Sequence, residues 1–272
     1  MRAVVSALLR QSMPPAAYWR VRAGWWCASF YVPRIAAAGF ARKNPEVHAY
    51  PGEGELARQL RQVNVLAPTE MCRVMTWHGS DKGAGRHNYT TVYSALFRRW
   101  RGQPLRIFEL GLGTNNPALQ STMGVNGRPG ASLRAWRQLF PRAQVFGADI
   151  DRDILFKEER IKTFYCDQLD GRTICDLWSQ PALRDGMDII IDDGLHTFEA
   201  NASFLGRSLE HLRPGGVYAV EDIHRDSIVQ WLRRLETTSS RLLAFCQFAL
   251  VQLPAPANLD DNNLLVIRKN VS

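Results

Sequence analysis

The chain is poor in cysteine and lacks any long hydrophobic run. It has five cysteines among 272 residues, an odd number without Cys-x-x-Cys spacing: Cys27, Cys72, Cys166, Cys175 and Cys246. This pattern argues against a disulfide framework or a zinc site, and it favours a reducing compartment with each cysteine packed as a small hydrophobic residue. No apolar stretch approaches the ~20 residues that cross a bilayer. We therefore expect a water-soluble, cytoplasmic body.

Acidic residues are missing from the first 45 positions, which carry seven basic ones. They are Arg2, Arg10, Arg20, Arg22, Arg34, Arg42 and Lys43. The rest of the chain is nearly balanced, so the net charge of +8 belongs almost entirely to this N-terminal arm. The body therefore gives no reason to expect a nucleic-acid partner.

The arm also contains a group of aromatic residues: Tyr18, Trp19, Trp25, Trp26, Phe30 and Tyr31. Two interpretations remain open. Residues 1–43 form either a helical segment that packs on the body as a substrate lid or homo-oligomer contact, or a peripheral membrane contact at the inner face of the membrane. A signal peptide is disfavoured because Pro14 and Pro15 interrupt the early apolar run.

The remaining sequence predicts one α/β domain after a linker. Pro45–Gly54 is rich in proline and glycine, so we assign 1–54 to arm and linker and 55–272 to the domain. The predicted helices are Glu55–Val65, Tyr89–Trp100, Ser132–Phe140, Phe198–Leu212 and Ser227–Leu235. The predicted strands are Arg106–Leu112, Gln144–Ile150, Ile161–Cys166, Met187–Asp193 and Gly216–Asp222, with an antiparallel closing pair at Leu242–Leu253 and Leu264–Arg268. Alternating strands and helices predict a parallel sheet with right-handed crossovers.

Two apolar strands end abruptly in pairs of carboxylates. Ile189–His196 reads Ile-Ile-Ile-Asp-Asp-Gly-Leu-His, and Gly216–Asp222 ends in Glu-Asp. Buried parallel strands deliver such residues to the carboxyl edge of the sheet, where open α/β sheets bind their ligands. Because four carboxylates would repel one another there, we expect a divalent cation with the histidine as an adjacent base.

A glycine-rich turn follows the strand that begins at Arg106. The segment Ile107–Asn116 contains Gly111 and Gly113, but Asn116 stands where a dinucleotide fingerprint needs a third glycine. With Glu109 before it, the turn resembles the first motif of class I methyltransferases, which bind S-adenosylmethionine. At the end of the next strand, Asp149 and Asp151 occupy the place where a carboxylate accepts the ribose hydroxyls. Asp167-Gln168, at the end of the strand after that, are placed to meet the adenine.

From His78-Gly-Ser-Asp-Lys-Gly83 to Pro214-Gly-Gly-Val-Tyr-Ala-Val-Glu-Asp222, motifs in order resemble one family. It is that of the metal-dependent sugar O-methyltransferases of macrolide biosynthesis, the macrocin and mycinamicin enzymes, which are grouped with proteins called cephalosporin hydroxylases. The resemblance implies Mg²⁺, or Mn²⁺, held by Asp193, Glu221 and Asp222, with His196 as general base. The cofactor residues expected for S-adenosyl-L-methionine are Ser80, Lys82, Glu109, Gly111, Gly113, Asp149, Asp151, Asp167 and Gln168.

The chain departs from the family pattern at several positions. Leu195 replaces a usual serine, Gly130-Ala131 replaces a double glycine, and the insertion Asn115–Arg128 is either a substrate loop or an oligomer loop. Asp192 is expected to support its loop rather than to bind metal. The interpretation of His224 is open between an acceptor contact and a helix cap, whereas His78 and His87 favour a surface loop.

The sequence thus predicts a doubly wound, Rossmann-like, seven-stranded methyltransferase sheet preceded by a helical arm. The expected reaction moves a methyl group from S-adenosylmethionine to a sugar hydroxyl of a glycosylated natural product, a glycolipid or a polysaccharide. One alternative is an iron-dependent hydroxylase, which would need two histidines and a carboxylate around iron. Another is a catalytically idle scaffold.

Overall fold

The computed structural model describes residues 43–83, 87–254 and 260–271. Within them the helices of four or more residues are α3 (Glu55–Arg61), α4 (Glu70–His78), α5 (Tyr89–Phe97), α6 (Ala131–Leu139), α7 (Gly171–Trp178), α8 (Phe198–Ser208), α9 (Ile228–Glu236) and α10 (Ser240–Phe245). The strands are β1 (Glu46–Tyr50), β2 (Arg106–Leu110), β3 (Gln144–Asp149), β4 (Lys157–Glu158), β5 (Ile161–Tyr165), β6 (Met187–Asp192), β7 (Leu212–Val220), β8 (Cys246–Gln252) and β9 (Asn263–Lys269). The predicted arm lies almost wholly outside the described residues.

The described strands form one mixed sheet in the order β1-β8-β9-β7-β6-β2-β3-β5-β4. The central strands β7, β6, β2, β3 and β5 are parallel. On one side β9, β8 and β1 continue the sheet in antiparallel pairing, and on the other β4 pairs antiparallel with β5. The doubly wound α/β prediction and the antiparallel closing pair are confirmed, and the sheet gains β1 and β4 at its edges beyond the seven predicted strands.

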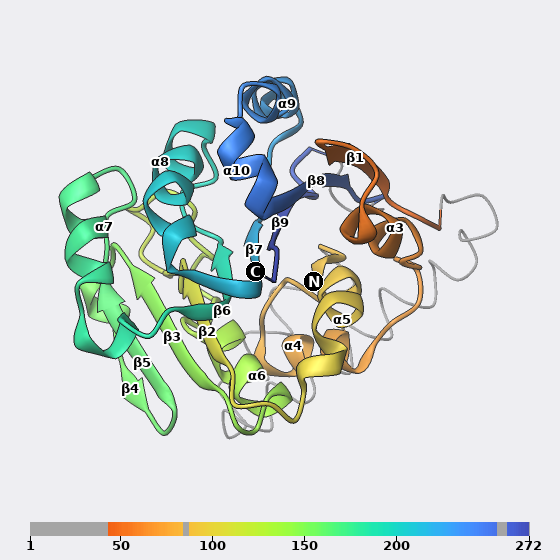
Figure 1. The fold of residues 1–272 in the computed structure, drawn as a ribbon. Coiled ribbons are helices and arrows are strands. Elements are labelled where there is room, and N and C mark those ends of the chain that lie inside the picture. The colour runs from red at the N-terminus through yellow and green to blue at the C-terminus, as the bar shows by residue number, and fades with distance from the viewer. Residues whose placement is uncertain (1–42, 84–86, 255–259, 272) are drawn as a thin grey trace.

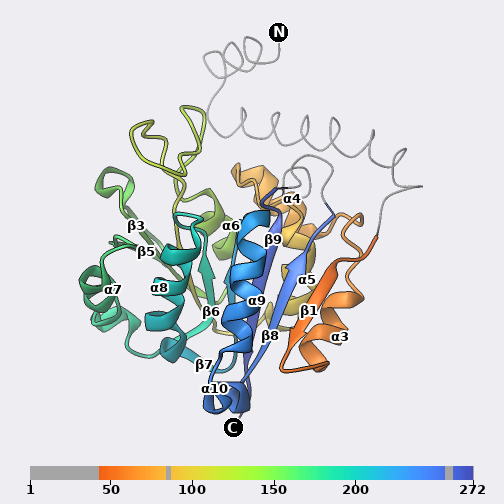
Figure 2. The same ribbon diagram turned by 90° about the horizontal axis from the view of Figure 1, so that it is seen from above.

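Helices cover both faces of the sheet (Figures 1 and 2). Alternate residues of a strand point to opposite faces, and β6 follows this rule. Ile189 and Ile191 belong to the hydrophobic cluster that includes residues of α3, α4, α5 and α6, whereas Ile190 belongs to the cluster that includes residues of α7, α8 and α9. The strand is therefore apolar on both sides, as a buried parallel strand must be.

Part of the predicted linker belongs to the sheet. Glu46–Tyr50 forms β1, which pairs with β8 from Glu46 opposite Gln252 to Tyr50 opposite Phe248. At the other end of the chain the predicted strand Leu242–Leu253 is a strand only from Cys246, because Ser240–Phe245 forms α10. The helices α4 and α7 were not predicted from the sequence.

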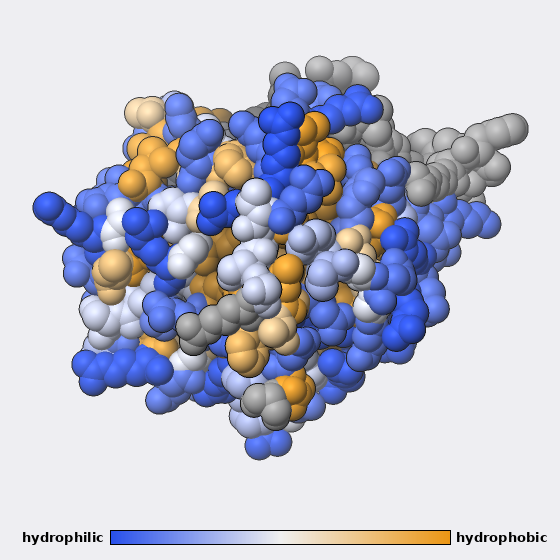
Figure 3. All heavy atoms as spheres, turned by 45° about the horizontal axis from the view of Figure 1, so that its top comes forward, coloured by the Kyte–Doolittle hydropathy of each residue, from blue (hydrophilic) through white to orange (hydrophobic). Residues whose placement is uncertain are grey.

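The surface drawn in Figure 3 is mainly hydrophilic, and its hydrophobic residues lie in small groups rather than one continuous patch. This is the ordinary pattern of a protein surface. Across residues 43–271, apart from the two short gaps, no helix combines the length and the apolar character needed to span a membrane.

Candidate active site

The predicted site lies at the carboxyl edge of the parallel strands, where the strand order reverses. From β2 the chain adds β3 on one side, and β6 takes the other side. Open α/β sheets bind ligands at such a switch point. A cavity of about 700 Å³ opens here, and this is within the usual size range of small-molecule sites.

Segments far apart in the sequence supply the cavity walls. They include Ser80, Lys82, His87, Gly111, Gly113, Ala118–Gly124, Asp149, Asp167, Gln168, Asp193, His196, Asp222 and Asp261. The structure therefore brings most of the predicted cofactor residues and much of the predicted metal site into one cavity. Glu109, Asp151 and Glu221 do not line it.

Gly111 and Gly113 have positive φ values of 88° and 76°. A Cβ atom added to Gly111 would stand 1.8 Å from the backbone oxygen of Asp193. The turn after β2 can therefore approach the turn after β6 only because Gly111 has no side chain. This close contact places the glycine-rich turn directly beside the acidic one.

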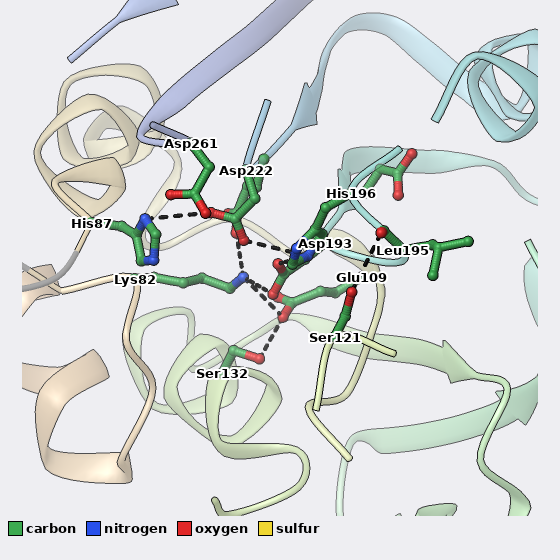
Figure 4. Close-up of polar contacts among 12 residues, drawn as sticks. Lys82, His87, Glu109, Ser121, Ser132, Asp193, Leu195, His196, Asp222 and Asp261 are labelled. Carbon is green, nitrogen blue, oxygen red and sulfur yellow. Dashed lines mark hydrogen bonds and ion pairs between the residues drawn. The ribbon is translucent and has the colours of Figure 1, made fainter. Parts of the chain in front are cut away.

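Asp193, His196 and Asp222 form a group whose potential ligand atoms lie within 4.8 Å of one another. His196 Nε2 is 3.3 Å from Asp193 Oδ1 and 3.3 Å from Asp222 Oδ2 (Figure 4). His196 and Asp222 have φ values of 63° and 52°, in the left-handed region. Strained conformations of this kind cluster at functional sites, so the backbone supports the predicted role of this group.

The carboxylates control the protonation of His196. Burial lowers its pKa, but the contacts with Asp193, Asp222 and Asp192 outweigh burial and raise it to about 10. The imidazole is therefore protonated at neutral pH while all three carboxylates face it. It becomes a base only when that negative charge is neutralised.

Glu221 is also near this group, but it faces the protein interior. One of its carboxylate oxygens accepts a hydrogen bond from Tyr93, and the other contacts the ammonium of Lys82. The same ammonium contacts Asp193 Oδ2. Asp193 and Glu221 therefore converge on one point, which is occupied by a cationic side chain.

Glu109 lies beneath the cavity. It is fully buried on β2, where it accepts hydrogen bonds from Ser132 Oγ and from Trp136 Nε1, the latter at 2.6 Å. Lys82 Nζ lies 3.5 Å from it. In this structure Glu109, the acidic residue of the first motif, therefore bonds to buried side chains below the cavity. Trp136 is a hydrogen-bond donor as well as a core residue.

The acidic residues at the ends of β3 and β5 organise backbone turns. Asp149 accepts hydrogen bonds from the amides of Leu112 (2.7 Å) and Asp151 (2.9 Å). Asp151 accepts hydrogen bonds from the side chain of Thr114 and from a backbone amide. Asp149 lines the cavity, while Asp151 lies behind it.

Gln168 joins two parts of the acidic turn. Its side-chain amide donates to Asp192 at 2.8 Å, and its carbonyl accepts from the Leu195 amide at 2.8 Å. Asp192 is fully buried, and burial raises its pKa to about 7. Asp192 thus holds the loop, as predicted, and Gln168 is its partner, while Asp167 takes part in the cavity wall.

Sequence reasoning missed the residues that orient the carboxylates from α5. Tyr89 donates to Asp222 at 2.6 Å, and Tyr93 donates to Glu221. Residues four apart lie on one face of a helix. The spacing of Tyr89 and Tyr93 in a predicted helix could therefore have indicated two hydroxyl groups pointing in the same direction. His87, expected on a surface loop, lines the cavity, and its Nδ1 lies 3.3 Å from Asp222 Oδ1.

The other weighed residues have structural roles. His224 caps the short helix that follows it by accepting from the Asp226 amide, and it is outside the cavity. His78 ends α4 and bonds to Gln138 on α6 at 2.7 Å. The insertion Asn115–Arg128 folds back on itself and lines the cavity, and Ser121 reaches the carbonyl of Leu195 at 3.3 Å (Figure 4).

No family model matches the chain. Curated relatives do match. They include the 8-demethyl-8-alpha-L-rhamnosyl tetracenomycin-C 2'-O-methyltransferase of Streptomyces olivaceus, 35% identical over 54% of this chain and 35% of that protein. The demethylmacrocin O-methyltransferase of Streptomyces fradiae is 34% identical over 52% of this chain and 33% of that protein. The mycinamicin VI 2''-O-methyltransferase of Micromonospora griseorubida is 36% identical over 50% of this chain and 32% of that protein.

Among solved structures the chain is similar to the MycE methyltransferase from the mycinamycin biosynthetic pathway, in complex with Mg and SAH. The TM-score is 0.54 and the identity 26%, over 79% of this chain and 60% of that one. The chain spans about a third of the length of the curated relatives it matches. The sequence and the sheet therefore agree: this chain has the class I methyltransferase fold and resembles the sugar O-methyltransferases of glycosylated natural products.

Proposed function

We propose that the chain is a metal-dependent O-methyltransferase that moves a methyl group from S-adenosylmethionine to a sugar hydroxyl of a glycosylated small molecule. The observation that supports this most is that the glycine-rich turn and the Asp193–His196–Asp222 group share one cavity. A methyl donor held at the first would lie beside a base held at the second. The relatives named above support the acceptor class.

The chain's own residues fit the cofactor. Gly111 and Gly113 have no side chain in the way and would let the backbone approach the methionine portion, while Asp149 and Asp167, which line the cavity at the neighbouring strand ends, would hold the adenosine portion. Residues 118–124 of the insertion line the same cavity.

The residues also fit a hard divalent cation. Asp193 and Asp222 offer carboxylate oxygens at ligand spacing, and Glu221 converges with Asp193 on the Lys82 ammonium, a position that already accommodates positive charge. Oxygen ligands of this kind suit Mg²⁺ or Mn²⁺. A bound ion would neutralise the carboxylates that keep His196 protonated and would acidify a hydroxyl beside it. His196 would take the proton of the acceptor hydroxyl as its oxygen bonds to the methyl carbon, and the methyl–sulfur bond would break to release S-adenosylhomocysteine.

The hydroxylase alternative has less support. An iron facial triad requires two histidines and one carboxylate around one ion. In the described part of the chain each of the two potential metal-ligand groups contains one histidine, His196 in one and His87 in the other. The scaffold alternative predicts that the carboxylates are dispensable for binding and catalysis.

Calorimetric titration with S-adenosylmethionine, with and without MgCl₂, tests the proposal on the wild type and on Asp193→Ala. We expect the wild type to bind the cofactor and the metal, and the variant to lose metal binding by about 100-fold or more because a carboxylate ligand is gone. Asp226→Ala is the matched control, since that side chain is 89% exposed. The binding-competent protein is then assayed for methyl transfer to glycosylated macrolides. Failure of the wild type to bind the cofactor in either buffer would reject the proposal.

A further inference from the structure

Lys82 is the most deeply buried cation near the site. It follows α4 on the loop that begins at Gly79, and its side chain is 3% exposed. Its ammonium contacts the carboxylates of Asp193 and Glu221 and lies 3.5 Å from that of Glu109 (Figure 4). These three carboxylates come from the ends of β6 and β7 and from within β2. One lysine therefore connects three strands of the sheet.

Each buried carboxylate is held from behind by a second donor. Tyr93 on α5 binds the other oxygen of Glu221, and Ser132 and Trp136 on α6 bind Glu109. Tyr93 therefore holds one oxygen of Glu221, and the ammonium of Lys82 holds the other. The ammonium sits at the centre of a site built around positive charge, and charged side chains are rarely so buried unless paired in this way.

The ammonium of Lys82 donates hydrogen bonds to two carboxylates, those of Asp193 and Glu221, and forms an ion pair with a third, that of Glu109. An ammonium group has three N–H donors, and three carboxylates surround this one within 3.5 Å. Lys82 also lines the cavity, and its binding of S-adenosylmethionine stays a prediction from the sequence. Two of its partners, Asp193 and Glu221, are the proposed metal ligands.

We propose that Lys82 is a tethered cation that positions Asp193 and Glu221 before the metal binds and then competes with the metal for them. The inference rests on the proposed metal site. The lysine has a flexible four-carbon stem, so its ammonium can withdraw toward Glu109 when a stronger cation arrives. The charge keeps the metal-free site assembled, and it weakens the affinity of that site for a divalent ion.

Substitution Lys82→Met tests this, because methionine keeps an unbranched stem and removes the charge. Lys157→Met, at an exposed position on β4, is the control. Each protein is titrated with MgCl₂ by calorimetry and with MnCl₂ by electron paramagnetic resonance of the free ion. We expect Lys82→Met to bind the ions at least about tenfold more tightly, because the variant removes the repulsion between the ammonium and the divalent ion. A tenfold change corresponds to only a modest fraction of the repulsion energy of two charges in contact. We also expect a larger rise in its melting temperature on adding metal than in the control.

Unchanged or weaker metal affinity in Lys82→Met would overturn the inference. So would loss of S-adenosylmethionine binding at unchanged metal affinity, since that result returns Lys82 to the cofactor. No metal binding by the wild type or by the variant overturns it as well. If both proteins bind metal as expected yet neither transfers a methyl group, the proposed function fails and the tethered cation stands.

If Lys82→Met does not fold, the double variant Lys82→Met/Glu109→Gln replaces it. The second change removes an opposing buried charge without touching a proposed metal ligand. We expect the double variant to fold and to show the same tighter metal binding relative to Glu109→Gln alone. Equal metal affinity in these two proteins would contradict the proposal.

Discussion

At the scale of single residues, the site depends on a position that has no side chain as much as on its carboxylates. Gly111 shows this best, because its positive φ and its distance to the Asp193 carbonyl leave no room for even a methyl group. The sequence marked this glycine as part of a cofactor turn. It gave no sign that the neighbour across the gap would be the backbone of a proposed metal ligand.

We expect Gly111→Ala to destabilise the protein by about 2–4 kcal/mol, since it combines a left-handed alanine with a backbone clash. It should also displace Asp193 and weaken metal binding. The control is Gly206→Ala on α8, where an added Cβ meets nothing within 4 Å and where alanine favours the helix. Urea unfolding of both variants checks the prediction, and equal stabilities of the two would contradict it.

Local sequence patterns indicated which carboxylates gather at the sheet edge. A buried strand and the position where it ends can be recognised from a few consecutive residues. The partners of those carboxylates were harder to find. Lys82, Tyr93 and Trp136 reach them from a loop and two helices, and such contacts depend on how the layers pack. The sequence therefore indicated the carboxylates, whereas their contacts with Lys82, Tyr93 and Trp136 were not foreseen.

At the scale of elements, the helices that cover the sheet were predicted where an apolar stripe repeats at helical spacing, as in α5, α6 and α9. β1 was missed, because a short segment between prolines and glycines resembles a linker until its partner is known. That partner, β8, lies at the other end of the domain. The pairing of β1 with β8 depends on the tertiary structure, so no local sequence pattern could predict it.

The contact between α4 and α6 gives an element-scale prediction. Burial lowers the pKa of His78 below 6.5, and its hydrogen bond to Gln138 only partly opposes this. The unfolded chain therefore binds a proton at this position more readily than the folded protein does. The contribution of His78 to stability should accordingly decline as the pH falls through about 6.5, with the full penalty below its folded pKa. His196 and Asp192, whose pKa values are raised, contribute with the opposite sign.

Chemical denaturation between pH 5 and pH 8 checks this. The stability of His78→Gln relative to that of the wild type should rise as the pH falls toward 5. His224→Gln, which alters an exposed histidine outside the cavity, should keep the wild-type dependence. Parallel curves of stability against pH for the wild type and His78→Gln would contradict the prediction.

At the scale of the whole molecule, the charge is divided between an arm and a body. The basic excess lies within the first 45 residues, whereas the cavity walls come from residues between Ser80 and Asp261. We expect deletion of residues 1–42 to leave binding of S-adenosylmethionine and Mg²⁺ within about threefold of the wild type, because the deletion removes no described wall residue. Calorimetry of the truncated protein checks this.

The same truncated protein separates the two interpretations of the arm. If the arm contacts membranes, truncation should lower the fraction of the protein that sediments with anionic vesicles. Each basic residue near such a surface contributes about 1 kcal/mol of binding free energy. Unchanged sedimentation excludes the membrane interpretation and leaves the lid or the oligomer contact. A loss of cofactor binding in the truncated protein would instead place the arm in the site.

The pairing of β1 with β8 has a consequence for how the protein is made. Glu46 leaves the ribosome before its partner Gln252, which follows about 200 residues later. At roughly 5–20 residues per second, a ribosome needs on the order of 10–40 s to supply it. Throughout that interval β1 has no strand to pair with. Its histidine and its acidic residue, His48 and Glu46, then help to keep the nascent segment from joining a neighbouring chain.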